Sequence, residues 1–373
     1  MQFTFSMKSA DGKIPDKADQ QNTKNITDNY SMIENIGGGT CGDVIKGMNI
    51  VTGEIVAMKK IKILDVNQGF PMNAMREIRI LRSISHENII KLHSVETSQD
   101  RYVYLIFDYC DYDLQGLLSQ TPLSFQQTKC YFRQLLLALD VCAKKKLIHR
   151  DLKPANILLT PQNVVKLCDF GLAKEMNNDK NRPQTNQVIT IWYRPPELLL
   201  GADHYGTEID IWSSGCILYE MITRKILFRS NFDNELDEIT AIFSVHGIPT
   251  IDEWSNWRSL PNAEIFMKNK SLSESGPKIS FKEFLEKTIP KEYEDATDLL
   301  LKLLAYDPNK RISVTEALNH PFITKDFEQY LPTKIPEINL PSCHQNQLYE
   351  KTRSKKSKKD LSSLRPKKVT PRP

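Results

Sequence analysis

The chain has 373 residues, of which 40% are hydrophobic and 26% are charged, and its formal net charge is +4. This composition is ordinary for a globular protein and excludes a wholly disordered or collagen-like chain. Seven cysteines without a C-x-x-C pair argue against a disulfide framework and a structural zinc site. No apolar run approaches the ~20 residues that span a bilayer, and the first residues lack a signal-peptide pattern. We therefore expect an intracellular protein without membrane contact.

The first 113 residues predict a small β-rich region. Residues 1–29 are polar and aperiodic, which predicts a flexible N-terminal extension. One helix is expected over residues 72–84, where Glu77 and Leu81 are four apart and share a face. Short β-branched or aromatic runs between turn residues predict strands at 32–36, 43–48, 55–61 and 102–107.

The chain after residue 113 predicts a larger helical region and a basic tail. Apolar residues at helical spacing predict helices at 125–145, 210–223, 234–245 and 296–304. Residues 351–373 contain ten Lys or Arg and one Asp, so the basic character of the protein belongs to this tail and the rest is mildly acidic. Such a tail fits nuclear import or nucleic-acid contact, and equally a solvated, disordered end.

A glycine-rich segment lies between the first two predicted strands. Gly37, Gly39, Gly42 and Val44 fit the pattern G-x-G-x-x-G-x-V. Glycines allow the backbone to approach phosphate closely because no Cβ intervenes. A dinucleotide-binding fold would need a helix after the glycines, whereas a strand is expected here. Taken alone, the pattern also fits a glycine-rich hairpin turn.

Four further motifs follow in order. They are Val-Ala-Met-Lys ending at Lys59, His-Arg-Asp-Leu-Lys-Pro-Ala-Asn at 149–156, Asp-Phe-Gly at 169–171 and Pro-Pro-Glu at 195–197. With the glycine-rich segment, this set resembles the eukaryotic serine/threonine protein kinases. The resemblance implies an α+β, bilobal kinase fold over residues 30–325. It consists of a small antiparallel β-rich N-lobe (30–108) with one regulatory helix, a hinge (108–113) and a larger helical C-lobe (114–325). A C-terminal extension would follow over 326–373.

The resemblance also implies catalytic roles, position by position. Asp151 matches the aspartate that accepts the proton of the substrate hydroxyl, and Lys153 matches a lysine that meets the γ-phosphate. Lys59 matches the lysine that orients the α- and β-phosphates, with Glu77 as its ion-pair partner. No essential residue is missing, so we do not expect a pseudokinase.

The implied cofactors are ATP and Mg²⁺. Asn156 and Asp169 match the magnesium ligands, and their oxygens suit a hard cation. The positions that match the ATP-binding site are Ile36, Gly37, Gly38, Gly39, Thr40, Cys41, Gly42, Asp43, Val44, Ala57, Lys59, Phe107, Asp108, Cys110, Asp113 and Leu158. Cys168 also resembles a residue of the adenine pocket.

Several motif residues are expected to have structural roles. Glu197 and Arg311 match a buried ion pair of the large lobe, and Asp210 matches a support for the catalytic loop. The residues that match a stacked apolar spine are Leu81, Leu92, His149 and Phe170. On this reasoning, His149 is a core residue and not a catalytic base.

Within the kinases, residues 69–77 resemble the cyclin-binding helix of the cyclin-dependent kinases. A cyclin would then move Glu77 toward Lys59 so that their ion pair forms. The alternative is that Phe70 and Met72 simply pack inside the small lobe.

The expected activation segment contains Thr185, which matches the activating phosphothreonine of this family. An activating kinase would phosphorylate it, and the added charge would order the loop through cationic partners. The matching phosphate pocket consists of Arg76, Arg150 and Lys174. Lys174 replaces a usual arginine and offers no bidentate fork. Thr190 matches a threonine that contacts the catalytic aspartate.

Val188, Ile189 and Arg194 resemble the pocket that selects proline after the phosphoacceptor. Because proline lacks an N–H, a site that leaves this donor unsatisfied favours Ser/Thr-Pro substrates. Cys41 occupies the position where cell-cycle members carry an inhibitory tyrosine, so that form of inhibition is not expected. Thr40 is either a modification site or a plain loop residue.

Residues 69–71, 107–114 and 340–344 resemble the transcriptional cyclin-dependent kinases. This resemblance implies a nuclear enzyme that phosphorylates the C-terminal repeat domain of RNA polymerase II with a cyclin of the T or K type. The alternatives are a cell-cycle kinase and, more remotely, a non-catalytic nuclear binding module. A mitogen-activated-type kinase is disfavoured because no Thr-x-Tyr lies between Asp169 and Glu197.

Overall fold

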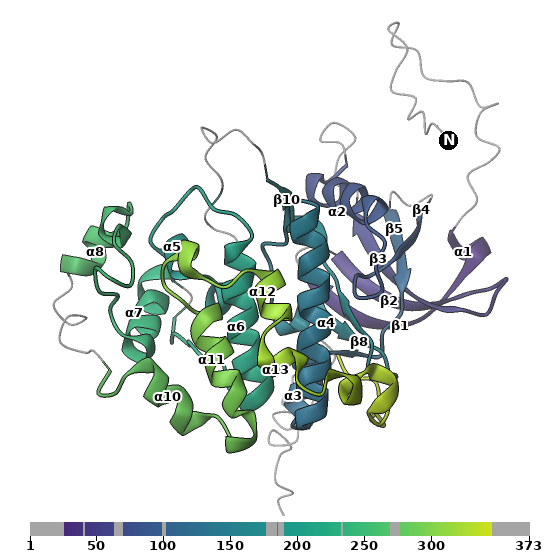
Figure 1. Ribbon diagram of the computed structural model, residues 1–373. Helices are drawn as coiled ribbons and strands as arrows, with labels where there is room; N and C mark the ends of the chain where they lie inside the picture. The colour runs from purple at the N-terminus through teal and green to yellow at the C-terminus, as the bar shows by residue number, and fades with distance from the viewer. Residues whose placement is uncertain are drawn as a thin grey trace, which may run out of the picture. The chain divides into compact units, whose positions relative to one another are not determined.

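A computed structural model describes residues 26–39, 42–62, 70–98, 102–176, 185, 190–232, 234–268 and 277–344. The chain divides into two compact units, which are described separately (Figure 1). The smaller unit contains Met1–Gly69 and His93–Phe107, and the larger contains Phe70–Leu92 and Asp108–Pro373. Within the described residues, no helix is both long and apolar enough to cross a membrane.

The smaller unit is built on a five-stranded sheet in the order β1-β2-β3-β5-β4 (Figure 1). β1 and β2 are antiparallel, as are β2 and β3. The strands are β1 (Tyr30–Gly39), β2 (Gly42–Asn49), β3 (Ile55–Lys62), β4 (Leu92–Thr97) and β5 (Tyr102–Asp108). The four strands expected from the sequence are present, and β4 is an addition.

A short helix, α1 (Ile26–Asn29), precedes β1. Ile26 is 2% exposed and belongs to a core cluster with Tyr30, Val56, Met58 and Ile106. The structure therefore differs at residues 26–29 from the expected flexible extension. The physical reason is that burial of the Ile26 side chain against the sheet favours an ordered conformation that polarity alone did not predict. Residues 1–25 lie outside the described part of the chain.

The larger unit begins with α2 (Met72–Ser83), the helix expected from the sequence. Its buried face carries Ala74, Glu77, Ile80 and Leu81. This helix packs against η3 (Phe170–Leu172), which contains the last two residues of the Asp-Phe-Gly motif. The division into units therefore groups α2 with the larger unit.

The remainder of the larger unit is mostly helical. Its helices are α3 (Leu114–Gln120), α4 (Phe125–Lys144), α5 (Pro196–Leu199), α6 (Glu208–Thr223), α7 (Glu235–His246), α8 (Ala263–Lys268), α10 (Phe281–Thr288), α11 (Glu294–Leu303), α12 (Val314–Leu318) and α13 (Pro321–Thr324). The 3₁₀-helices, besides η3, are η2 (Pro154–Asn156), η4 (Ile191–Tyr193), η5 (Trp257–Ser259), η6 (Lys291–Tyr293), η7 (Pro308–Lys310), η8 (Phe327–Tyr330) and η9 (Pro332–Lys334).

Helix α6 forms the centre of this unit and packs against α4 and α11 (Figure 1). Every residue from Ile209 to Met221 is buried, so the helix has no solvent-facing stripe. Helix α4 begins at a capping box in which Ser124 and Gln127 satisfy each other's backbone N–H groups. These two helices provide the rigid support for the loops that carry the sequence motifs.

Five short strands lie among the helices of the larger unit. They form a three-stranded sheet in the order β6-β8-β9 and a separate pair, β10-β7. Their bounds are β6 (Tyr112–Asp113), β7 (Leu147–Ile148), β8 (Ile157–Leu159), β9 (Val165–Leu167) and β10 (Lys174–Glu175). Strands β7 and β8 lie directly before and after the 149–156 motif, and β9 ends just before the Asp-Phe-Gly motif, so this β structure positions both motifs.

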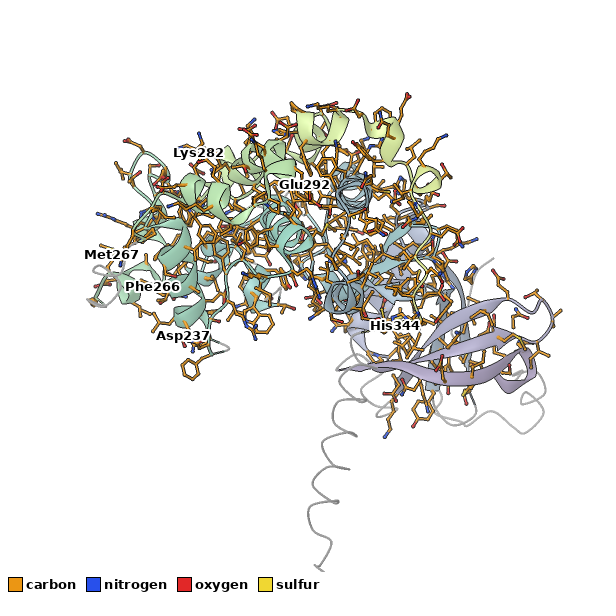
Figure 2. All side chains as sticks on the ribbon, turned by 90° about the horizontal axis from the view of Figure 1, so that it is seen from below. Asp237, Phe266, Met267, Lys282, Glu292 and His344 are labelled. Carbon is orange, nitrogen blue, oxygen red and sulfur yellow. The ribbon has the colours of Figure 1, made fainter. Side chains whose placement is uncertain are left out.

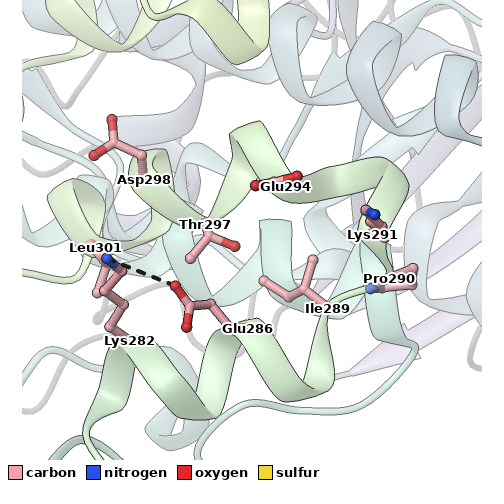
Figure 3. Close-up of a pocket in the computed structure, with 9 residues that line it drawn as sticks. All are labelled: Lys282, Glu286, Ile289, Pro290, Lys291, Glu294, Thr297, Asp298 and Leu301. Atoms are coloured by element: carbon pink, nitrogen blue, oxygen red, sulfur yellow. Dashed lines mark ion pairs between the residues drawn. The ribbon is translucent and has the colours of Figure 1, made fainter.

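A groove of about 620 Å³ lies between α10 and α11 (Figure 3). Charged side chains of both signs line it, including Lys282 and Glu286, which form an ion pair at 3.8 Å. Lys282 is also labelled in the view of all side chains (Figure 2). No residue of the expected catalytic or nucleotide-binding set lines this groove, so it is separate from the site described next.

Candidate active site

The His-Arg-Asp-Leu-Lys-Pro-Ala-Asn segment brings three polar side chains to one point. Lys153 Nζ lies 2.8 Å from Asp151 Oδ2. The Asn156 amide donates to the same Oδ2 at 3.0 Å and to the Asp151 carbonyl oxygen at 2.8 Å. Thr190 Oγ1 donates to Asp151 Oδ1 at 3.3 Å. Both oxygens of the Asp151 carboxylate therefore have partners. The contact with Thr190 is the one expected from the sequence.

Asp210, at the start of α6, anchors this loop. It is 3% exposed, and its carboxylate accepts the backbone N–H groups of His149 at 2.7 Å and Arg150 at 3.0 Å. Burial raises the pKa of Asp210, while His149 and these two N–H groups oppose the rise. Arg150 has φ of 65°, a left-handed conformation that is costly for a non-glycine residue. The buried carboxylate stabilises that conformation directly before Asp151.

His149 is fully buried and both its ring nitrogens have partners. Nε2 donates to the Cys168 carbonyl oxygen at 2.9 Å, and Nδ1 accepts the Asp151 backbone N–H at 3.3 Å. Its ring meets Phe170 edge-on at 4.8 Å between centroids. An imidazole with both nitrogens occupied positions the loop and has no nitrogen available for a substrate.

The Asp-Phe-Gly segment adds a second strained residue. Asp169 has φ of 62° and ψ of 67° and is partly buried. The backbone N–H of Cys168 donates to the Asn156 carbonyl oxygen at 3.0 Å, which ties this segment to the catalytic loop. Asn156 and Asp169 thus lie on two segments joined by main-chain hydrogen bonds.

The donor set around Asn156 fits a magnesium ion. The hydrogen bonds to Asp151 use the amide nitrogen of Asn156, and its amide oxygen is the atom type that Mg²⁺ prefers. No cluster of three or more His, Cys, Asp or Glu suited to a metal occurs among the described residues. Mg²⁺ commonly takes only one or two protein ligands and completes its shell with water and phosphate.

Two arginines converge beside the Asp-Phe-Gly segment. Arg76 Nη1 donates to the Gly171 carbonyl oxygen at 2.8 Å, and Arg150 Nε donates to the Leu172 carbonyl oxygen at 2.7 Å. Burial, followed by the positive charge of Arg150, lowers the pKa of Arg76. Two guanidinium groups that bind neighbouring carbonyl oxygens form a cationic site in which an anion would be stabilised. Lys174, the third expected residue, lies on β10 and is partly buried.

Thr185 is exposed, and its carbonyl oxygen accepts a hydrogen bond from Tyr205 at 2.5 Å. The same Tyr205 hydroxyl accepts from Arg150 Nη1 at 3.2 Å. No sequence motif contains Tyr205, because its role depends on contacts with Arg150 and Thr185 that form only in the folded chain. It connects the expected activation segment to Arg150, and sequence reasoning missed it.

The glycine-rich segment forms the β1–β2 hairpin of the smaller unit. Gly39 pairs with Gly42, and Gly38 pairs with Asp43. Gly42 has φ of +122°, and a Cβ at this position would lie 2.1 Å from the Lys60 carbonyl oxygen. Only glycine fits there. Thr40 and Cys41 lie outside the described residues.

Other expected nucleotide-binding residues of the smaller unit lie on strands β1, β2, β3 and β5. Val44 on β2 is opposite Lys59 on β3 in the strand register. Lys59 and Ala57 are partly buried. Ile36 on β1 and Phe107 on β5 are buried at 6% and 7% exposure. Glu77, the expected partner of Lys59, is 3% exposed on α2 in the larger unit.

The hinge segment (residues 108–113) is covered by the C-terminal segment (residues 335–344). Tyr112 and Cys343 form a parallel β-bridge. The Cys343 N–H donates to the Asp111 carbonyl oxygen at 3.1 Å, and its own carbonyl accepts from Asp113 N at 3.3 Å. Tyr112 Oη donates to the Leu340 carbonyl oxygen at 2.7 Å. The C-terminal segment has no sequence periodicity, and its pairing with the hinge segment therefore gives it an ordered conformation.

Side chains of the hinge segment are also engaged. Asp113 caps α3 by accepting the Gly116 N–H at 2.6 Å, and its Oδ2 lies 3.7 Å from His344 Nδ1. Asp108 forms an ion pair with Lys166 at 3.1 Å. Burial raises the pKa of the Cys110 thiol to about 12, so it stays protonated. His344, the last described residue, is labelled in Figure 2.

The expected proline-selecting pocket is described only at Arg194. Its Nη1 lies 3.0 Å from Glu235 Oε1 at the start of α7. Val188 and Ile189 lie outside the described residues, as does the basic tail. The ion pair expected between Glu197 and Arg311 is present, with two parallel bonds of 2.6 Å.

Comparison with known proteins places these features in context. The family model for the protein kinase domain matches residues 30–323. Cyclin-dependent kinase 12 of Drosophila melanogaster is 39% identical over 354 residues, which are 91% of this chain and 29% of that protein. The CTD kinase subunit alpha of Saccharomyces cerevisiae is 37% identical over 332 residues, 88% of this chain and 60% of that protein.

A solved structure is similar as well. A chain in the crystal structure of the yeast RNA polymerase II CTD kinase CTDK-1 complex is 36% identical, with a TM-score of 0.72. The match covers 85% of this chain and 97% of that one. The chain spans less than two thirds of the length of the two curated relatives described above.

Proposed function

Because this chain belongs to the protein kinase family, we propose that it is the catalytic subunit of a cyclin-dependent serine/threonine kinase acting on RNA polymerase II. It transfers the γ-phosphoryl group of ATP to Ser/Thr-Pro sites of the C-terminal repeat domain. The observation that carries the proposal is the convergence of Lys153 and Asn156 on Asp151. The 37% sequence identity with the yeast CTD kinase subunit alpha supports the C-terminal repeat domain as the substrate.

Asp151 acts as the proton acceptor. A carboxylate within reach of the substrate hydroxyl takes its proton as the new P–O bond forms. Lys153 and Thr190 restrict the rotation of this carboxylate, and Asn156 ties it to its own backbone. This positioning matters because phosphoryl transfer depends on alignment and charge stabilisation and involves little covalent chemistry by the protein.

ATP and Mg²⁺ are the cofactors. Asn156 and Asp169 hold the metal, which neutralises phosphate charge when it is bound. The glycines of the β1–β2 hairpin and Lys59 on β3 bind the phosphates, and Glu77 orients Lys59. The apolar expected residues of β1, β2 and β5, with the hinge segment, bind the adenine.

The cyclin binds on α2. Met72 and Met75 are 74% and 47% exposed on this helix, although large apolar side chains favour burial. The opposite face of α2 is buried, and Arg76 links the helix to Gly171. A partner on the exposed face therefore acts on the Asp-Phe-Gly segment through one helix. By resemblance, this cyclin is of the T or K type.

Phosphorylation of Thr185 by a separate kinase completes activation. The guanidinium groups of Arg76 and Arg150, which bind the neighbouring carbonyl oxygens of Gly171 and Leu172, support an anion at this place because a phosphate offsets two positive charges. Lys174 contributes a point charge. Arg194, together with Val188 and Ile189, selects proline in the substrate. A polymerase substrate and the basic tail are both consistent with an enzyme that acts in the nucleus.

The experiment is affinity capture of the full-length chain from cells, followed by a kinase assay on polymerase repeat peptides. We expect a transcriptional cyclin in the complex and phosphorylation of Ser-Pro sites. A repeat peptide with alanine in place of the following proline should be a poor substrate. The Asp151→Asn variant should retain the cyclin and lose activity by about 10²–10⁴-fold. Recovery of a cell-cycle cyclin without repeat phosphorylation would overturn the proposal.

A further inference from the structure

Tyr205 lies in the connection between α5 and α6 and makes two contacts that cross the larger unit. Tyr205 is buried, with 8% of its surface exposed. The phenol oxygen is 3.2 Å from Arg150 Nη1 in the catalytic loop and 2.5 Å from the Thr185 carbonyl oxygen in the expected activation segment. Twenty residues separate Thr185 from Tyr205, and 55 separate Arg150 from Tyr205. One hydroxyl thus joins two functional segments.

The direction of these hydrogen bonds is determined by their chemistry. A guanidinium group can only donate, and a carbonyl oxygen can only accept. The Tyr205 hydroxyl must therefore accept from Arg150 and donate to Thr185. Burial raises the pKa of Tyr205, so the proton that it donates is retained at neutral pH. Phenylalanine has a similar shape and can make neither bond.

Arg150 is the residue through which this contact reaches the expected phosphate pocket. It directly precedes Asp151, and Asp210 holds its strained backbone. Its Nε donates to Leu172 just after the Asp-Phe-Gly motif. Arg76 Nη1 donates to the carbonyl oxygen of Gly171, the residue before Leu172, so the two guanidinium groups bind neighbouring main-chain oxygens. Tyr205 consequently contacts the arginine that the expected phosphate pocket shares with the catalytic loop.

We propose that Tyr205 is a positioning residue that holds the main chain of Thr185 at the Arg76–Arg150 pair. This inference rests on the proposed activation by phosphorylation of Thr185. A hydroxyl that fixes the main chain of Thr185 reduces the conformational freedom that is lost when the phosphate binds the arginines. Tyr205 thereby increases the activation gained from phosphorylation, and it contributes little to the unphosphorylated enzyme.

The test uses the full-length chain with its cyclin, before and after phosphorylation of Thr185. For Tyr205→Phe, we expect kcat/KM for a Ser-Pro peptide to fall about fivefold in the phosphorylated complex, the effect of one hydrogen bond. The unphosphorylated complex should change less than about twofold. A phosphatase should remove the Thr185 phosphate about fivefold faster from the variant. This second readout needs no kinase substrate and reports on the segment itself.

Tyr293→Phe is the matched control. Its hydroxyl pairs with Thr128 at 3.2 Å, and its residue is 3% exposed, so the same atom is lost from a buried site. We expect it to leave activation and dephosphorylation unchanged. Equal losses in both phosphorylation states of Tyr205→Phe, or an unchanged phosphatase rate, would overturn the inference alone. A wild-type complex that gains nothing from Thr185 phosphorylation would overturn the activation mechanism together with the inference.

Discussion

The side-chain amide of Asn156 donates twice to Asp151, to its carbonyl oxygen at 2.8 Å and to its Oδ2 at 3.0 Å. Asn156 therefore positions the proposed proton acceptor in addition to its proposed role as a metal ligand. These two roles use different atoms of one amide. Aspartate at this position would keep oxygen ligands and lose both donated hydrogen bonds.

We predict that Asn156→Asp lowers kcat/KM by about 10²-fold or more, because a carboxylate repels Asp151 and misaligns it. Steady-state kinase assays and thermal unfolding of the same samples measure the effect. Asn309→Asp is the matched control, since the Asn309 amide also donates to an aspartate, Asp307, but at an exposed position. Equal activity of the two variants would refute the positioning role of Asn156.

A second prediction concerns the buried pair of Glu197 and Arg311, which are 3% and 7% exposed. Burial raises the pKa of Glu197, while Arg311 opposes the rise. Arg311→Met leaves that carboxylate buried without its cation and should reduce the free energy of unfolding by about 3–5 kcal/mol. Urea unfolding at neutral pH provides the measurement.

Two further variants test this interpretation of the pair. Glu197→Leu combined with Arg311→Met should be more stable than Arg311→Met alone, because no unpaired charge remains buried. Lys287→Met removes an exposed pair with Glu283 on α10 and should cost less than about 0.5 kcal/mol. A double variant less stable than Arg311→Met would show that the remaining contacts of the Glu197 side chain stabilise the fold by more than its unpaired charge destabilises it.

A third prediction tests the contact between α3 and the C-terminal segment. A Cβ on Gly116 would lie 2.8 Å from the Cys343 carbonyl oxygen. Gly116→Ala favours the helix by about 1 kcal/mol yet should displace this segment. Cys343 is 2% exposed, so we expect its labelling by a thiol reagent to become faster, as followed by peptide mass spectrometry.

Gln115→Ala is the control for Gly116→Ala because it changes the adjacent residue of the same helix. It should leave the labelling rate of Cys343 unchanged. If Gly116→Ala also leaves this rate unchanged, the C-terminal segment is held mainly by its bonds to Asp111 and Tyr112. The prediction would then be wrong.

The sequence predicted the longer elements because their hydrophobic patterns are strong. The strands near Ile45 and Leu105 and the helices near Leu135 and Leu218 lie where β-branched runs or helical spacing placed them. Strand β4 was missed because Leu92–Thr97 contains His, Ser and Glu and lacks a clear alternation. The short helices were missed because caps and tertiary contacts, and not periodicity, decide elements of four to eight residues.

The candidate site divides in a similar way. Motif spacing indicated Asp151 and Asn156, because these residues are only five apart and one loop brings them together. Tyr205 and the hinge contacts of Cys343 depend on chain segments that meet only after folding. Hydrophobic periodicity and local motif spacing carry no information about such long-range contacts. Ile26 illustrates the same limit in the smaller unit, where packing orders a polar stretch.

His246, at the end of α7, is a histidine whose protonation should make the free energy of unfolding depend on pH. Its ring stacks on Phe281 at 4.0 Å and lies 4.2 Å from the Tyr306 ring, and Nε2 donates to the Leu304 carbonyl oxygen at 2.9 Å. Burial lowers its pKa to about 4, partly opposed by Leu304 and by Glu253. The imidazole is thus neutral in the folded protein over a range where an unfolded chain would protonate it.

We therefore predict that the free energy of unfolding is insensitive to His246 above pH 7 and decreases as the pH falls from about 6.5 to 4, by at most about 3 kcal/mol. Below pH 4 both states are protonated and this loss is complete. His246→Gln retains a donor for Leu304 without titrating, so its decrease over this range should be shallower. Urea unfolding followed by tryptophan fluorescence reports on this region, because Trp212 stacks 6.3 Å from His246. His204→Gln, at an exposed position, should retain the wild-type decrease, and an equally steep decrease in His246→Gln would assign the acid sensitivity to other groups.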